Sequence, residues 1–91
     1  MLKYDNYNVK EAKSFFQRLF GLMFKKNINY ALLFNNCRSI HTFFMLINID
    51  VIAFDKNDKI VKKYKNIHPG KIIIAPKNTA KILEIPSKKS K

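Results

Sequence analysis

Several features that would place a protein in a familiar class are scarce or missing in this sequence. A single cysteine, Cys37, excludes an internal disulfide bond. The longest apolar runs, YALLF and FFMLI, are far shorter than the ~20 residues that span a bilayer as a helix. No charged stretch followed by an apolar one opens the chain, so no secretory signal is expected. These absences predict a soluble, cytoplasmic protein with no membrane partner.

Acidic residues are also scarce, because 6 Asp and Glu stand against 18 Lys and Arg, a formal net charge of +12. Such a basic chain attracts nucleic acid, anionic lipid and acidic proteins. Only Arg18 and Arg38 are arginines, however, and arginine is the residue whose planar fork suits phosphates and bases. The lysines are spread along the chain. We therefore expect no direct nucleic-acid binding, and sequence-blind binding through a lysine-rich surface is kept as an alternative.

The length and composition fit one domain. The chain has 91 residues and a hydrophobic content of 47 %, which is enough for a modest core. No internal repeat and no linker divides it. We expect a single β-rich domain over residues 1–86 and a charged, disordered tail over residues 87–91.

One helix is expected near the N-terminus. Apolar residues recur at three- and four-residue steps over residues 9–23, which is typical of a helix with one buried stripe. Asn8 and Glu11 have the spacing of a capping box. Gly21 suits the left-handed residue that ends many helices. The pattern predicts a helix over about residues 9–20, packed against the core.

The rest of the chain has the composition of short strands. Five runs are expected to be strands: YALLF (30–34), IDVIAF (49–54), KIVKKYK (59–65), KIIIA (71–75) and AKILEI (80–85). The polar DKND and HPG segments favour turns between them. Lysines on the exposed run 59–65 would deter pairing with other chains. With the helix, these strands predict an α+β fold, mainly β: a compact antiparallel sheet or barrel-like domain with one N-terminal helix.

The run SIHTFFMLINID, residues 39–50, is mostly apolar but carries polar side chains. Both alternating sets of residues in its middle are apolar, as in a strand covered on both faces. His41 and Thr42 stand at its start. Asp50 stands at its end, where a carboxylate needs a partner. We interpret the run as a buried strand, and its polar residues as candidates for a site.

Chemical interpretations of these residues start from Cys37 and His41. They are four residues apart, and a histidine can hold a cysteine as thiolate, so a thiol-dependent hydrolase is one hypothesis. The simpler interpretation is a small buried cysteine beside a hydrogen-bonded histidine. Together with His68 they offer metal ligands, but their spacing is not that of a zinc site. We expect no metal and no cofactor, and a binding protein more than an enzyme.

A further interpretation is electrostatic. Arg18, Asp50 and Glu84 each stand among apolar neighbours, and a buried arginine requires a carboxylate. Arg18 paired with Asp50 or Glu84 would lock the helix onto the sheet. The same arrangement could bind a small polar ligand.

Three segments together resemble the domain of unknown function family 192: RLFGLMF (18–24), LLFNNCRSIHTFFMLINIDVIAFD (32–55) and AKILEIP (80–86). The resemblance implies a small prokaryotic domain with a mainly antiparallel β fold, a short helical segment carrying the Arg-Gly-Leu-Met motif, and no established activity. The family pattern falls on Arg18, Gly21, Leu22, Met23, His41, Thr42, Met45, Asp50 and Glu84.

The sequence departs from the family pattern in two places. Asn48 stands where relatives usually have a proline before the Ile-Asp pair, and asparagine also tolerates turns. Family members typically continue past LEIP through a further strand, whereas here SKKSK follows. The resemblance therefore predicts an uncovered sheet edge, through which two copies could form a homodimer.

These observations predict a small cytoplasmic binding or accessory domain for an unidentified small molecule or protein. Its pocket is expected between the end of the helix and the neighbouring strands. The candidate binding residues are Arg18, His41, Thr42, Asp50 and Glu84. The residues expected to be structural are Gly21, Leu22, Met23 and Met45.

Overall fold

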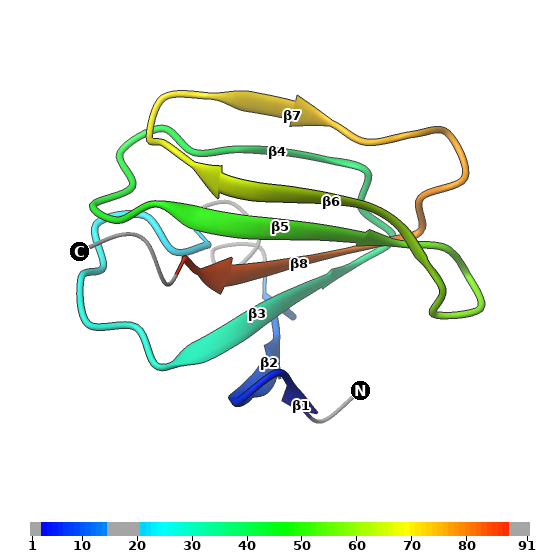
Figure 1. The fold of residues 1–91 in the computed structure, drawn as a ribbon, viewed down its shortest axis with the longest axis horizontal. Helices are drawn as coiled ribbons and strands as arrows, with labels where there is room; N and C mark the ends of the chain where they lie inside the picture. Colours follow the sequence, from blue (N-terminus) through cyan, green and yellow to red (C-terminus); the bar gives the residue numbers. More distant parts are fainter. Residues whose placement is uncertain (1–2, 15–20, 88–91) are drawn as a thin grey trace.

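The computed structural model describes residues 3–14 and 21–87, and over these residues the chain folds into strands and loops. The strands are β1 (Lys3–Tyr4), β2 (Tyr7–Glu11), β3 (Tyr30–Asn35), β4 (Ser39–His41), β5 (Ile49–Phe54), β6 (Ile60–Ile67), β7 (Ile72–Ile74) and β8 (Lys81–Pro86). Six of them form one sheet in the order β1-β2-β3-β8-β5-β6, and β4 and β7 form a separate ribbon. Figure 1 shows the sheet twisting from β3 to β6 and the ribbon along its upper side.

The three central strands are β3, β8 and β5. They carry apolar residues on both faces, as is usual for strands whose two faces are both buried. Leu83 of β8 lies between Leu33 of β3 and Ile52 of β5 and belongs to one buried cluster. On the opposite face, the next β8 residue, Glu84, lies between Leu32 and Val51, which belong to the larger cluster. The strands expected over 30–34, 49–54, 59–65, 71–75 and 80–85 correspond to β3, β5, β6, β7 and β8. The mainly β character is thus confirmed.

The turn between β5 and β6 forms where the sequence indicated it. Asp55 Oδ1 accepts hydrogen bonds from the backbone N–H groups of Asn57 (2.8 Å) and Lys59 (3.0 Å). Asp58 takes a left-handed φ of 62° at the end of the turn. The pKa of Asp55 is lowered mainly by the hydrogen bond from the Lys59 N–H and to a smaller extent by that from the Asn57 N–H, because both bonds stabilise the carboxylate. The aspartate therefore holds the hairpin in its ionised form.

The expected helix over residues 9–20 is wrong. Tyr7–Glu11 is strand β2, and Val9 pairs with Ala31 in parallel register, so the apolar side chain of Val9 packs on a sheet. Asn8 is a strand residue and not a helix cap. Residues 15–20 lie outside the described part of the chain. The described part contains no helix. It therefore also contains no helix long and apolar enough to cross a membrane.

The expected long strand over residues 39–50 is also shorter than the pattern suggested. β4 ends at His41, and Thr42–Asn48 forms a loop before β5. The Met45 N–H donates to the Thr42 carbonyl at 3.3 Å, and Phe44 has a φ of 61°, which lies outside the range of regular strand backbone. The chain turns here because Thr42 is anchored to another loop, as described below.

Candidate functional site

Thr42 is the anchor between the β4 end and the loop that precedes β7. Its side chain is fully buried. Its hydroxyl donates to the His68 carbonyl at 2.9 Å and accepts the Lys71 N–H at 2.8 Å. Its carbonyl accepts the Gly70 N–H at 3.0 Å. These bonds occupy the hydroxyl in both directions, so Thr42 acts as a structural clamp.

Asp50 closes a bulge in β6. One β5 residue, Asp50, lies opposite two β6 residues, Lys65 and Asn66, and Asn66 has a left-handed φ of 53°. Asp50 Oδ1 accepts the Asn66 N–H at 2.8 Å, and its Oδ2 lies 3.5 Å from the Lys65 ammonium. The carboxylate thus has a local structural role. Since Asp50 pairs with Ile85 and Glu84 pairs with Val51, the two carboxyl groups lie on opposite faces of the sheet.

Cys37 and His41 each engage backbone atoms close by in sequence. The Cys37 thiol donates to the Ser39 carbonyl at 3.2 Å, and its side chain packs against the larger apolar cluster. His41 Nδ1 accepts the Phe43 N–H at 3.2 Å, and the two rings stack with centroids 5.2 Å apart. Among the described residues, no three His, Cys, Asp or Glu side chains gather as metal ligands.

Glu84 carries one of the two buried side-chain oxygens that have no hydrogen-bond partner among the described residues; the other is the Thr79 hydroxyl. Its side chain is 2 % exposed, and its Oε1 has no hydrogen-bond partner in the described residues. Burial raises the pKa of Glu84 to about 8, because the charged form is disfavoured away from water. The carboxyl group is therefore mainly neutral at pH 7. Arg18, its expected partner, lies outside the described residues.

The segment carrying Gly21, Leu22 and Met23 packs directly over Glu84. Gly21 has a left-handed φ of +53°, and a Cβ there would lie 3.3 Å from both Glu84 Oε1 and Phe34 Cζ. Leu22 is fully buried in the larger cluster, and Met45 is almost fully buried in the same cluster. The close approach explains why the position suits glycine.

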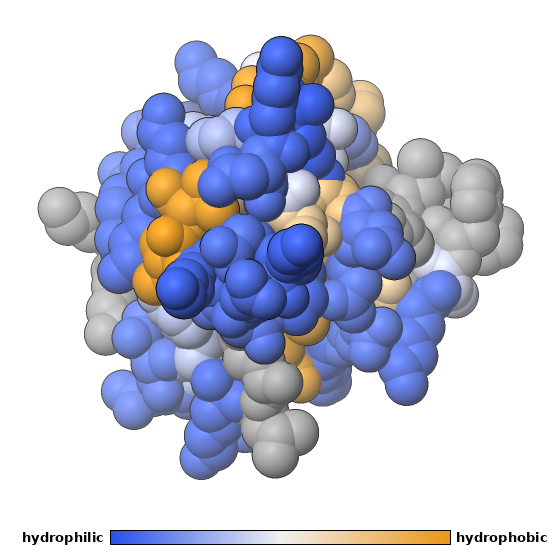
Figure 2. All heavy atoms as spheres, turned by 90° about the vertical axis from the view of Figure 1, so that its right-hand side faces the viewer, coloured by the Kyte–Doolittle hydropathy of each residue, from blue (hydrophilic) through white to orange (hydrophobic). Residues whose placement is uncertain are grey.

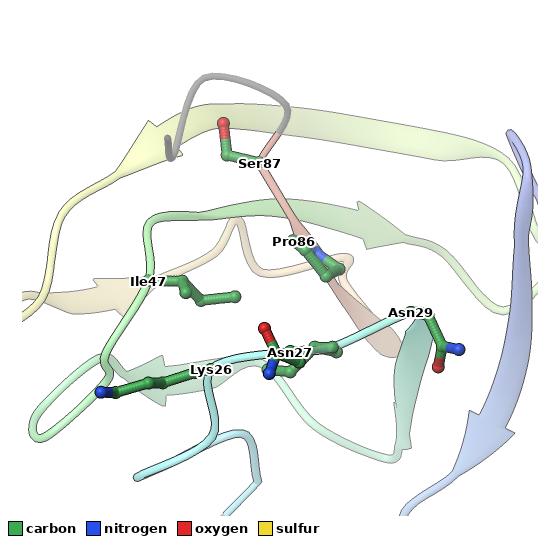
Figure 3. A pocket seen from close by; sticks show the side chains of 7 residues that line it. Lys26, Asn27, Asn29, Ile47, Pro86 and Ser87 are labelled. Carbon is green, nitrogen blue, oxygen red and sulfur yellow. The ribbon is translucent and has the colours of Figure 1, made fainter.

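An open pocket of about 490 Å³ lies at the end of this face of the sheet. We call it the loop pocket. It is lined by Lys26, Asn27, Ile28, Asn29, Ile47, Pro86 and Ser87. Ile28 and Ile47 also pack against the larger cluster, so the pocket opens onto the core. In Figure 3 the side chains of Asn27, Ile47 and Pro86 lie toward the middle of the pocket, while the Lys26 ammonium points outward at its rim.

β8 connects the loop pocket to Glu84. Pro86 and Glu84 are two residues apart on this strand and therefore share a face, about 7 Å apart along it. β8 ends at Pro86, and the N–H of the next residue, Ser87, donates a hydrogen bond to the Asn48 carbonyl at 3.0 Å. Ser87, expected in the tail, is thus buried beside the pocket, and residues 88–91 lie outside the described part.

Two exposed aromatic residues flank the loops that form the pocket. Phe24 and Phe44 are 62 % and 64 % exposed, and their rings stack with centroids 5.6 Å apart. Both have left-handed φ angles, 63° and 61°, and the Phe24 N–H bonds the Phe44 carbonyl at 3.0 Å. Left-handed backbone is unfavourable for residues with such side chains. Holding this aromatic pair at the surface therefore lowers the free energy of unfolding.

None of the residues that line the loop pocket is among the site residues predicted from the sequence. Lys26–Asn29 carries no periodic pattern, and Ile47 lies in the run that is predicted to be a buried strand. The one available signal was Pro86, which ends the LEIP motif. Three chain segments far apart in sequence meet at the pocket, and no spacing rule brings them together.

Comparison with known proteins identifies the family. The family model for domain of unknown function 192, described as "Uncharacterized ACR, COG1430", matches residues 2–91. The chain belongs to this family. The expected resemblance is therefore confirmed, and the match extends over nearly the whole sequence.

The relatives of this family member are prokaryotic proteins of the UPF0127 group. One from Thermococcus sibiricus is 45 % identical over 85 residues, which cover 86 % of this chain and 54 % of the relative. One from Pyrococcus horikoshii is 42 % identical over 84 residues, which cover 86 % of this chain and 71 % of the relative. The chain spans little more than half the length of the Thermococcus sibiricus relative.

Two solved structures share the fold. A protein of unknown function from Novosphingobium aromaticivorans has a TM-score of 0.78 at 18 % identity, covering 90 % of this chain and 64 % of that one. A putative transcription regulator from Sinorhizobium meliloti has a TM-score of 0.78 at 20 % identity, covering 89 % of this chain and 69 % of that one. At these identities the likeness concerns the fold alone.

Proposed function

We propose that this domain is a binding module that holds a small ligand with an apolar body and an anionic head group in the loop pocket. The observation that carries the proposal is the pocket itself, which has about 490 Å³ of space. Small-molecule sites usually fall between about 300 and 1,000 Å³ and combine apolar walls with a few polar groups. Ile28, Ile47 and Pro86 provide such walls, and the Asn27 amide provides a polar group among them.

The charges around the pocket favour an anion. Lys26 stands at the rim, and the described lining contains no carboxylate. The nearest carboxyl group along β8 is that of Glu84, and burial raises its pKa to about 8, so at pH 7 it does not repel an anion. The formal charge of +12 adds a long-range attraction for the same sign of ligand.

A binding role fits the polar residues better than catalysis does. The hydroxyl of Thr42 and the carboxylate of Asp50 are engaged in holding loops and a bulge. Cys37 and His41 bond the backbone of their own segment, which gives the thiol-dependent hydrolase hypothesis no geometric support. The cheap test of that alternative is the alkylation rate of Cys37 against pH, since a catalytic thiolate would react well below the ordinary thiol pKa of ~8.5.

The test uses three probes with the same chain and different head groups: hexanoate, hexylamine and hexan-1-ol. In amide NMR titrations, hexanoate should shift the signals of residues 26–29, 47 and 87 and should bind more tightly than the other two. Lys26→Gln should weaken hexanoate binding by about two- to fivefold, the value of one exposed charge pair, and should leave hexan-1-ol unaffected.

Lys77→Gln is the matched control, because Lys77 is exposed and lies outside the pocket. It lowers the net charge by the same amount and should leave hexanoate binding unchanged. Preferred binding of hexylamine, or shifts centred away from the loop pocket, would contradict the proposal.

A second candidate function is sequence-blind nucleic-acid binding. It is supported by the net charge of +12, which attracts polyanions. The face shown in Figure 2 is mostly hydrophilic, with separate apolar patches. This candidate predicts affinity for a short oligonucleotide that falls steeply with salt concentration, and salt-insensitive or absent binding would remove it.

A further inference from the structure

The outer edge of β7 is unpaired in the described part of the chain. β7 has β4 as its strand partner and is the uppermost strand in Figure 1. The N–H groups of Thr42 and Ala75 donate across the ribbon, at 2.8 Å each, just beyond the two ends of the paired region. Since hydrogen-bonded pairs alternate along an antiparallel ladder, the main-chain groups of Ile72 and Ile74 point away from β4.

The side chains of the same two residues are exposed. Ile72 and Ile74 are 66 % and 67 % exposed, whereas Ile73 between them is buried on the core side. His41 lies opposite Ile72 in the ribbon, and Phe43, stacked on His41, extends the apolar surface. We call Ile72 and Ile74, with their outward main-chain groups, the β7 edge.

The β7 edge differs from β6, which is one of the two outer strands of the large sheet. β6 carries Lys62, Lys63 and Lys65 along its exposed length, which is a common way to prevent pairing with another chain. β7 consists of isoleucine alone. An edge with free N–H and C=O groups, apolar side chains and no internal charge is a template for an added strand.

Positive charge stands at both ends of the β7 edge. Lys71 precedes β7 directly and is exposed. At the other end the Arg38 side chain is fixed by a hydrogen bond from its Nε to the Ala75 carbonyl at 2.9 Å. A strand that adds here therefore meets a cation at each end of a short apolar segment.

We propose that the β7 edge binds an extended segment of a partner protein, whose alternating apolar residues cover Ile72 and Ile74 and whose acidic residues face Lys71 and Arg38. The exposed backbone groups specify a strand, and the flanking charges specify its acidic ends. A second copy of this chain fits less well. Two β7 edges would bring the same cations together on molecules that each carry a charge of +12. This surface is separate from the loop pocket, and the proposal does not depend on the ligand suggested there.

The experiment titrates labelled protein with two capped peptides, EVTVTVE and its lysine counterpart KVTVTVK. We expect the acidic peptide to shift the amide signals of residues 71–75 most strongly and to protect the Ile72 and Ile74 amides from hydrogen exchange. The lysine counterpart should bind at least about tenfold more weakly, which corresponds to ~1.4 kcal/mol.

Ile74→Lys should abolish binding of the acidic peptide, because it places a charge on the apolar contact. Ile60→Lys on β6 is the control, since Ile60 is also an exposed isoleucine, and it should bind the peptide like the parent protein. Equal binding of the two peptides, shifts spread over the lysines, or no binding of either at millimolar concentration would overturn the proposal. Concentration-dependent dimerisation that Ile74→Lys removes would assign the edge to a second copy instead and would also overturn it.

Discussion

At the scale of single residues, Glu84 has the environment least suited to its chemistry. Its carboxyl group lies between Leu32 and Val51 on the buried face of the sheet, and Gly21 packs against its Oε1. Burial raises the pKa of Glu84 from its ordinary value of 4.5 to about 8. Between these two pH values the unfolded chain releases a proton that the folded protein keeps.

The free energy of unfolding should therefore fall as the pH rises from about 4.5 to about 8. The folded form binds the extra proton, so its advantage is complete below the unfolded pKa and is lost as the pH rises through the folded pKa. The slope should reach about 1.4 kcal/mol per pH unit, measured by urea unfolding at a series of pH values. Glu84→Gln should flatten this slope. Glu11→Gln, at an exposed position, should preserve it, and an unchanged slope in Glu84→Gln would refute the assignment.

Gly21→Ala should destabilise the protein more than Gly70→Ala does. Both glycines have left-handed φ angles, +53° and +86°, so each substitution adds backbone strain of about 1–2 kcal/mol. Only at Gly21 does the new Cβ meet neighbours, Glu84 Oε1 and Phe34 Cζ, at 3.3 Å each, whereas nothing lies within 4 Å at Gly70. We expect a difference of about 1 kcal/mol in the free energy of unfolding from this crowding. Equal losses in urea unfolding would mean that the segment over Glu84 is not tightly packed.

At the scale of elements, the ribbon of β4 and β7 depends on Thr42 beyond its own backbone ladder. Thr42→Val removes the hydroxyl that joins the His68 carbonyl and the Lys71 N–H while keeping the shape of the side chain. Two partly buried backbone groups then lose their partner, so we expect a loss of about 1–3 kcal/mol in the free energy of unfolding. Thr79→Val is the control, because the Thr79 hydroxyl is buried without a hydrogen-bond partner among the described residues. It should change stability by less than about 0.5 kcal/mol or raise it, and equal losses at both sites would contradict the clamp.

At the scale of the whole molecule, repulsion among the lysines should make folding sensitive to salt. Two ion pairs join described residues to each other, Lys65 with Asp50 and Lys81 with Asp58, against a net charge of +12. The Debye length falls from ~30 Å to ~10 Å between about 10 and 100 mM salt, which screens the repulsion. The thermal midpoint should therefore rise over this range.

A variant with fewer charges separates repulsion from general salt effects. Lys62→Gln combined with Lys63→Gln lowers the net charge from +12 by two, and both side chains are exposed on β6. Its thermal midpoint should rise less with salt than that of the parent protein. A midpoint that falls with salt in the parent protein would show that attractive pairs dominate.

Local sequence patterns predicted the strands that are stabilised by short-range features. The β5–β6 hairpin follows from apolar runs on either side of a turn that Asp55 closes with its own side chain. The same kind of reasoning failed for residues 9–20, because helical spacing of apolar residues also occurs when Val9 packs as a strand beside β3. It failed again after His41, where a buried hydroxyl bond to a distant loop ends the strand.

The sequence alone determined the family, the mainly β composition and the positive charge, because motifs, composition and alternation are properties of the chain itself. The tertiary structure decided which polar residues meet. Strand pairing sets Asp50 and Glu84 on opposite faces, and the meeting of three loops forms the pocket. These outcomes depend on register between distant segments, since a shift of one residue exchanges the two faces of a strand. Such pairings are fixed by the packing of the whole sheet, which no local pattern contains.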